Sequence, residues 1–191
     1  MATMPPISRM NPWMLTLDTA AATARRERLA DILIDAVEGG ASVNFLWPLE
    51  RQAALAYWDR VIAALAAGQL YLFVIEDADR ILGTVQLAPA PQPNQAHRAD
   101  IAKLLVARVA RRHGLGRVLM KTAEAQARRL GRTLLTLDTE TGGAAETLYR
   151  SMGYQPFGVV PRHAQLPDGR FADTTFFFKH LDRGGGIGPT T

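Results

Sequence analysis

Cysteine is absent from the 191 residues of this chain. Its absence excludes disulfide bonds, thiolate metal sites and a covalent acyl-cysteine intermediate, so any group transfer must use another route. The four histidines show no ligand spacing with one another or with carboxylates, and we predict no metal site.

A long apolar run is also missing. No segment approaches the roughly 20 apolar residues that span a bilayer. The N-terminal stretch MATMPPISRMNPW lacks the basic-then-apolar order of a signal peptide. We therefore expect a cytoplasmic protein with no membrane partner.

A strong charge imbalance is lacking too, since 22 Lys and Arg face 18 Asp and Glu and the formal net charge is +4. Seven arginines nevertheless fall in one segment: Arg108, Arg111, Arg112, Arg117, Arg128, Arg129 and Arg132. Local positive potential is expected there, and a small polyanionic ligand is enough to explain it.

Apolar residues are abundant, at 48% of the chain, and the length suits one globular domain better than two. We place this domain at residues 12–182. The ends, 1–11 and 183–191, are expected to be flexible tails, because the glycines of RGGGIGPTT lose too much entropy on ordering.

The hydrophobic periodicity predicts helices and strands in the order β-αα-ββ-β-α-β-α-ββ. The expected strands are WMLTLD, LYLFVIE, ILGTVQLA, HRADIAKLLVAR, TLLTLD, YQPFGVV and TTFFFKHL, and the expected helices cover 29–38, 48–67, 115–130 and AAETLYRSM. TETGG is expected to be a turn. The pattern indicates a mixed α/β domain built on a single sheet.

The stretch RRHGLGRVLMK, residues 111–121, lies where a strand is followed by the most clearly amphipathic helix of the chain. The first N–H groups of a helix have no intrahelical acceptors, and the helix dipole adds positive potential, so this end binds anions. Gly114 and Gly116 leave the main chain accessible to a phosphate, while Arg111, Arg112 and Arg117 can add charge-assisted hydrogen bonds.

Spacing separates three phosphate-binding motifs at this junction. The P-loop requires Gly-Lys-Ser/Thr, which is absent, and the dinucleotide fingerprint requires glycine at position 119, which is leucine. The remaining pattern is Arg/Gln-x-x-Gly-x-Gly/Ala, matched by Arg111, Gly114 and Gly116. Taken alone, these three residues also fit an ordinary strand-to-helix turn, in which the glycines relieve backbone strain.

The surrounding sequence resembles the GNAT family of acyl-CoA N-acyltransferases. The family's helix signature, Ala-x-x-Leu-Tyr-x-x-x-Gly-Tyr/Phe, is met at Ala145, Leu148, Tyr149, Gly153 and Tyr154. The resemblance covers about residues 14–181. It implies the GNAT fold, with one mixed and mostly antiparallel sheet flanked by helices, and acetyl-CoA as the donor.

The resemblance also implies the cofactor-binding residues. In the family, the strand before the glycine loop bulges so that its backbone binds the pantetheine arm, which points to Leu104, Leu105 and Val106. The pyrophosphate loop comprises Arg111, Arg112, His113, Gly114, Leu115, Gly116 and Arg117. Tyr149 maps onto the family's tyrosine, which protonates the coenzyme A sulfur or orders the thioester; without the family context, its setting beside Leu148 and Met152 favours a core residue.

Two carboxylates are candidates for handling the acceptor amine. Asp138 ends an apolar strand, and Asp100 lies on the neighbouring strand ahead of the cofactor segment. Carboxylates with a pKa near 4 are poor bases for an ammonium, so binding it and passing its proton to water suits them better. Asp138 could instead cap a helix, and Asp100 could be an exposed strand carboxylate. Glu140 is expected to be solvated or to contact the substrate.

The acceptor is expected to be a small-molecule amine, acetylated by direct transfer in a ternary complex. The stretches LDTE, LYRSMGY, PDGR and FFFK are similar to those of a GNAT member that acetylates an amino-acid toxin. A protein or peptide acceptor would fit the same enzyme class. Outside this class, the sequence also permits a silent coenzyme A binder or a basic nucleic-acid-binding module. The oligomeric state cannot be predicted.

Overall fold

The computed structural model describes residues 12–78 and 80–181, and the predicted flexible tails lie outside these ranges. A seven-stranded sheet runs through the molecule in the order β1-β2-β3-β4-β5-β7-β6. All neighbouring strands are antiparallel except β4 and β5, which are parallel. The predicted mixed, mostly antiparallel sheet is therefore confirmed.

The strands are β1 (Trp13–Leu17), β2 (Tyr71–Asp77), β3 (Arg80–Pro89), β4 (Arg98–Val106), β5 (Leu134–Glu140), β6 (Gln155–Gln165) and β7 (Phe171–His180). The α-helices are α1 (Thr19–Ala24), α2 (Arg26–Glu38), α3 (Arg51–Ala66), α4 (Leu115–Arg129) and α5 (Ala144–Ser151). Short 3-10 turns, η2 (Pro93–Gln95) and η3 (Arg108–Ala110), flank β4. No helix of the described ranges is long and apolar enough to cross a membrane.

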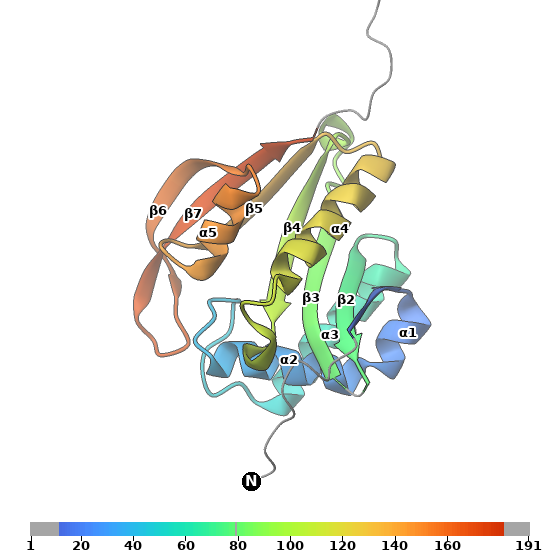
Figure 1. Ribbon diagram of the computed structural model, residues 1–191, viewed down its shortest axis with the longest axis vertical. Coiled ribbons are helices and arrows are strands. Elements are labelled where there is room, and N and C mark those ends of the chain that lie inside the picture. Colours follow the sequence, from blue (N-terminus) through green and yellow to red (C-terminus); the bar gives the residue numbers. More distant parts are fainter. Residues whose placement is uncertain (1–11, 79, 182–191) are drawn as a thin grey trace, which may run out of the picture.

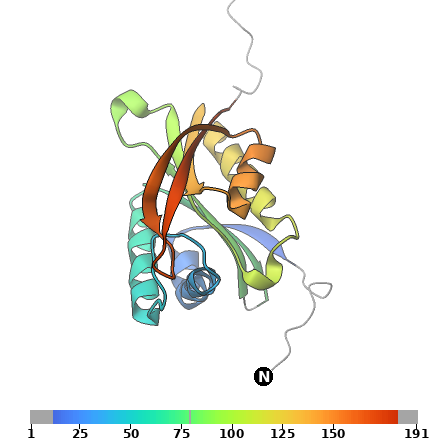
Figure 2. The same ribbon diagram turned by 90° about the vertical axis from the view of Figure 1, so that its left-hand side faces the viewer.

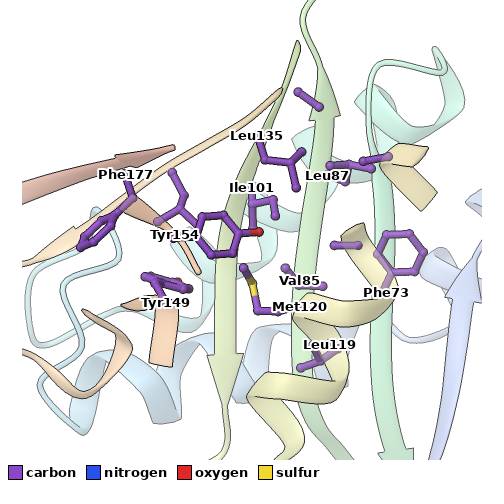
Figure 3. Close-up of a cluster of buried hydrophobic side chains, with 14 of the residues drawn as sticks. Phe73, Val85, Leu87, Ile101, Leu119, Met120, Leu135, Tyr149, Tyr154 and Phe177 are labelled. Carbon is purple, nitrogen blue, oxygen red and sulfur yellow. The ribbon is translucent and has the colours of Figure 1, made fainter. Parts of the chain in front are cut away.

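The helices cover both faces of the sheet (Figure 1). In the turned view, α4 and α5 lie on one side and α1 to α3 on the other (Figure 2). Each face has its own core of buried side chains. Leu119, Met120 and Phe177 belong to the core under α4 and α5, drawn in Figure 3, whereas Leu33 and Trp58 belong to the core under α2 and α3.

The pairing between β4 and β5 is short. Arg98 to Asp100 on β4 are in register with Leu134 to Thr136 on β5. Beyond these residues β4 continues beside β3 and β5 continues beside β7, so the two strands separate (Figure 1). Among the described residues, the later backbone of β4 has no strand neighbour on that side, and the glycine junction follows directly.

A β-bulge interrupts β4 within this unpaired stretch. Thr84 pairs with Leu105 and Gln86 with Ala102, so Lys103 and Leu104 together oppose one residue of β3. Lys103 has a positive φ of 51°, and the hydroxyl of Thr84 donates to its carbonyl oxygen at 3.0 Å. The bulge expected before the glycine loop is therefore present.

The helix expected before Gly39 is present as α2, and a short additional helix, α1, precedes it, separated by a turn of the chain at Arg25. One local expectation was wrong. The turn TETGG starts later than expected, since Thr139 and Glu140 extend β5 by pairing with Thr175 and Thr174 of β7. Asp138 therefore lies inside the strand rather than at its end.

Candidate active site

The glycine junction places a helix N-terminus at the separated end of β4. Gly114 is the N-cap of α4 with φ 79° and ψ 0°, a left-handed conformation that glycine adopts without steric cost. No side chain of the described residues caps this end. A Cβ added to Gly114 would meet no described atom within 4 Å, so the space beside this residue is open. The junction fits an anionic group on structural grounds.

Gly116 has a different role, which is close packing. A Cβ at this position would lie 3.1 Å from Leu148 Cδ2, with Val106 Cγ2 and Leu104 Cδ2 at 3.8 and 3.9 Å. The glycine thus lets α4 approach both α5 and the bulged strand. Leu105, by contrast, points to the opposite core. Leu105 is therefore buried, whereas Leu104 and Val106 are partly buried against the core under α4 and α5.

Several arginines of the basic segment are held by other parts of the protein. Arg108 donates to Asp35 at 2.7 Å and to Glu38 at 2.5 Å, and Arg117 donates to Ser151 Oγ at 2.7 Å. Arg111 Nε donates to the carbonyl oxygen of Val106 at 3.3 Å. Much of the positive charge in this segment is therefore engaged within the protein.

Arg112 and His113 complete the loop between η3 and α4. Arg112 adopts a positive φ of 65° and is exposed, with no hydrogen bond to any described residue. Nδ1 of His113 lies 2.6 Å from the carbonyl oxygen of Arg111, which fixes the ring against the loop. Arg112 is consequently the most accessible cation at the junction.

Tyr149 of α5 is both a core residue and a neighbour of a carboxylate. Its side chain is buried, with the rings of Tyr154 and Phe177 at 5.8 and 6.1 Å (Figure 3). Burial raises the pKa of its phenol well above the usual value, and the negative charge of Asp138 adds to that increase. The phenol is therefore protonated at neutral pH and remains a proton donor.

A cleft of about 340 Å³ opens beside the separated end of β5. Its walls are the loop before α3, the end of β5 and the β6–β7 pair, through Ser42, Asn44, Phe45, Leu46, Asp138, Thr139, Glu140, His163, Ala164, Gln165 and Thr174. We call it the carboxylate cleft, after Asp138 and Glu140. Its size is at the lower end of pockets that hold small molecules.

Asp138 is exposed to this cleft and does not cap a helix, since Gly143 is the N-cap of α5. Asp100, the other predicted carboxylate, lies at the last paired position of β4, opposite Thr136. Arg98 Nη1 donates to it at 2.5 Å, and the hydroxyl of Thr136 donates to the same oxygen. The two carboxylates are therefore in different settings, one open and one already paired.

Lys103 was not among the predicted residues. Its half-buried side chain carries the ammonium to 5.7 Å from the ring centroid of Tyr57, and burial lowers its pKa, an effect that the nearby Asp138 carboxylate partly offsets. In the sequence, Lys103 lies between apolar neighbours on a strand, so hydrophobic periodicity does not indicate a site residue there. The feature that places it at the site is the bulge, which is visible only once the strand pairing is known.

The aromatic residues near the cleft differ in exposure. Phe45 lines the carboxylate cleft and contacts Tyr57 edge to face at 5.5 Å. Trp58 is fully buried, so it belongs to the core, and Trp47 lies at a separate cavity of about 180 Å³. Among the described residues, no group of three or more His, Cys, Asp and Glu side chains is arranged to hold a metal ion.

Comparison with known sequences gives a family match. The profile of the "Acetyltransferase (GNAT) family" matches residues 23–154, from α1 to the start of β6. A relative from Azospirillum brasilense, called "Uncharacterized N-acetyltransferase in hisH-hisA intergenic region", is 36% identical over 112 residues. That match spans 58% of this chain and 65% of the relative, which is just under two thirds of its length.

Solved structures share the fold. The ribosomal-protein-alanine N-acetyltransferase of Brucella melitensis superposes with a TM-score of 0.72 at 24% identity, covering 88% of this chain and 99% of the other. The phosphinothricin acetyltransferase of Sinorhizobium meliloti, solved in complex with AcCoA, gives a TM-score of 0.74 at 16% identity, covering 95% and 94%.

Proposed function

The chain belongs to the acetyltransferase (GNAT) family, as its motifs predict, and on that premise we propose that it transfers an acetyl group from acetyl-CoA to the amine of a small molecule. The observation that carries the proposal is the position of two features at the β4–β5 separation. The glycine junction follows the separated end of β4, and the carboxylate cleft includes the separated end of β5.

Acetyl-CoA is the donor used by this family, and it supplies an activated thioester. In the proposed site, the free N–H groups at the start of α4 and the guanidinium of Arg112 bind the pyrophosphate. The rest of the predicted loop, Arg111, His113, Leu115 and Arg117, shapes this cradle. The bulged backbone from Leu104 to Val106 binds the pantetheine arm.

The chemistry is direct transfer, because the chain has no cysteine to carry the acetyl group. Asp138 binds the acceptor ammonium in the carboxylate cleft and passes its proton to water, which leaves the amine nucleophilic. The amine nitrogen then bonds to the thioester carbonyl carbon as the carbon–sulfur bond breaks. Tyr149, which burial keeps protonated, would give its proton to the departing thiolate and take up the second proton that the acceptor nitrogen loses, so that no phenolate is left beside Asp138.

Asp100 is the second carboxylate of the proposed site. Its ion pair with Arg98 orients the carboxylate at the point where the strands separate. In the proposed mechanism, Asp100 relays through water the proton that Asp138 releases.

The acceptor is proposed to be an amino-acid-like toxin or antibiotic. The stretches LDTE, LYRSMGY, PDGR and FFFK are similar to those of the tabtoxin resistance protein, which acetylates an amino group of such a toxin. The Sinorhizobium neighbour is named for phosphinothricin, and the volume of the carboxylate cleft supports a small molecule. The Brucella neighbour, named for a ribosomal protein, supports a peptide acceptor as the second candidate.

The test is coenzyme A release from acetyl-CoA across free amino acids, amino-acid-like antibiotics, aminoglycosides, polyamines and peptides. Turnover of the first two groups is expected. Turnover of peptides alone would overturn the small-molecule assignment. A nucleic-acid-binding module would instead show salt-dependent retention on DNA; the internal contacts of Arg108, Arg111 and Arg117 argue against it.

A further inference from the structure

Lys103 is a cation that the proposed transfer does not use. It sits at the bulge of β4, and its half-buried ammonium has no hydrogen bond or ion pair to the described residues. Its contact is the ring of Tyr57, 5.7 Å from the ammonium. A half-buried lysine without a counter-ion costs stability that a methionine of similar length would not, so its presence calls for a function.

The surface beneath Lys103 is rigid. The amide of Gln86 donates to the hydroxyl of Tyr57 at 2.9 Å, and both residues are largely removed from solvent. Phe45 and Trp58 pack edge-on against the same ring at 5.5 and 5.2 Å. A cation above a fixed aromatic face is held in place without being neutralised. Lys103 therefore keeps its charge available to something else.

The charge that faces Lys103 is Asp138, on the other side of the β4–β5 separation. The carboxylate is close enough to influence the ammonium, yet the two form no ion pair. Arg60 lies over the Tyr57 ring as well, 6.0 Å from its centroid. Asp138 and Phe45 both line the carboxylate cleft, and Phe45 contacts the Tyr57 ring over which the Lys103 ammonium lies, so Lys103 is one aromatic contact away from the cleft that Asp138 lines.

We infer that Lys103 is a specificity-determining residue, which binds a carboxylate carried by the acceptor close to its reacting amine. The acceptor ammonium pairs with Asp138 and its carboxylate pairs with Lys103, so that an amino acid in its zwitterionic form matches both charges. An amine without a carboxylate leaves the lysine unpaired and desolvated. This inference rests on the proposed function and narrows its acceptor class.

The experiment compares amino acids with their decarboxylated amines: L-lysine with cadaverine, L-ornithine with putrescine, and L-tyrosine with tyramine. The readout is the ratio of kcat/KM within each pair, from coenzyme A release. The acid-bearing member is expected to lead by roughly tenfold or more, as for one charge-assisted hydrogen bond. Lys103→Met should bring the ratio close to one through a raised KM, and Lys103→Arg should largely restore it.

Lys121→Met is the matched control, because Lys121 is exposed on α4, and it should leave the ratio as in the wild type. Thermal unfolding checks that Lys103→Met folds, and it should be at least as stable as the wild type. A preference for the decarboxylated amines, or a ratio that Lys103→Met does not alter, overturns the inference while the proposed function stands. No turnover of any amine overturns both.

Discussion

Arg98 connects two strands through the side chain of Asp100. One guanidinium nitrogen donates to the Asp100 carboxylate at 2.5 Å and to Thr136 Oγ1 of β5 at 3.0 Å. The remaining N–H groups bind Gln95 Oε1, at 2.7 Å from Nη2. These bonds lie at the last position where β4 and β5 pair, so Asp100 is fixed at the point of separation, whereas Asp138, further along β5, is free to meet a ligand.

The two carboxylates should therefore differ in mutational effect. Asp138→Asn is expected to lower kcat/KM for the acceptor by on the order of a hundredfold, because an amide neither pairs with an ammonium nor passes its proton on. Asp100→Asn should cost less than about tenfold, since Arg98 and Thr136 already occupy it. Steady-state kinetics with each acceptor measures both. A larger loss for Asp100→Asn would make that residue the principal carboxylate.

Gly114 should combine a structural and a binding effect. In Gly114→Ala a side chain must adopt φ 79°, which destabilises the fold by about 1 kcal/mol and lowers Tm by about 2–4 °C. The new methyl group also enters the open space beside this residue, at the start of α4, so affinity for coenzyme A should fall.

Gly131→Ala provides the control at the other end of α4. Gly131 has φ 69° and open space around it, so the loss of stability should be similar, but no anion site is disturbed. Calorimetric titration with coenzyme A separates the two variants. Equal affinity in both would remove Gly114 from the cofactor site.

The sequence predicts the elements around the site better than the site itself. The amphipathic period of α4 and the glycines at its start are local signals, and the helix forms where expected. The pairing of β4 with β5 over three residues is not local, because it depends on how β7 returns to lie beside β5. The separation of the two strands could therefore be expected only from the family resemblance.

Lys103 is a single residue whose position could likewise not be predicted from local sequence signals. On a regular strand, Lys103 would share a face with Ile101, which packs in the core under α4 and α5, but the bulge shifts the alternation, and Lys103 reaches the ring of Tyr57 on α3. Asp138 was predicted as a site residue because the ends of strands often present side chains that bind ligands. In the structure, β5 continues past it to Glu140. Asp138 lines the carboxylate cleft, but the pairing does not support the reason for which it was predicted as a site residue.

Away from the site, Glu76 on β2 should make stability depend on pH. Arg25 binds its carboxylate through two hydrogen bonds of 2.8 and 2.7 Å, and this arginine lowers the pKa of Glu76 below its ordinary 4.5. A lowered folded-state pKa means that the stabilisation is complete above 4.5 and is lost as the pH falls through the folded value.

Glu76→Gln should accordingly lose about 2–3 kcal/mol at neutral pH, because Arg25 is left half-buried without its partner. The difference in unfolding free energy between Glu76→Gln and the wild type should become smaller as the pH falls below 4.5. Urea unfolding across this range measures it. Glu27→Gln, in an exposed pair with Arg51, should cost under about 1 kcal/mol. A gap for Glu76→Gln that does not change with pH would contradict the ion-pair account.

Tyr149→Phe should separate chemistry from packing. The ring keeps its contacts with Tyr154 and Phe177, so the variant should fold and bind coenzyme A as the wild type does. Loss of the proton donor should lower kcat by on the order of a hundredfold.

Tyr154→Phe is the matched control for this prediction. Its ring lies 5.8 Å from that of Tyr149. Its hydroxyl, however, is buried beside Glu124, and Asp138 is not among the charges that shift its pKa. The Tyr154 variant should therefore keep the wild-type kcat. Rapid-quench measurement of the acetylated product in a single turnover distinguishes a slow transfer step from slow release. If Tyr149→Phe transfers the acetyl group at the wild-type rate, Tyr149 is a core residue only, and water must protonate the thiolate.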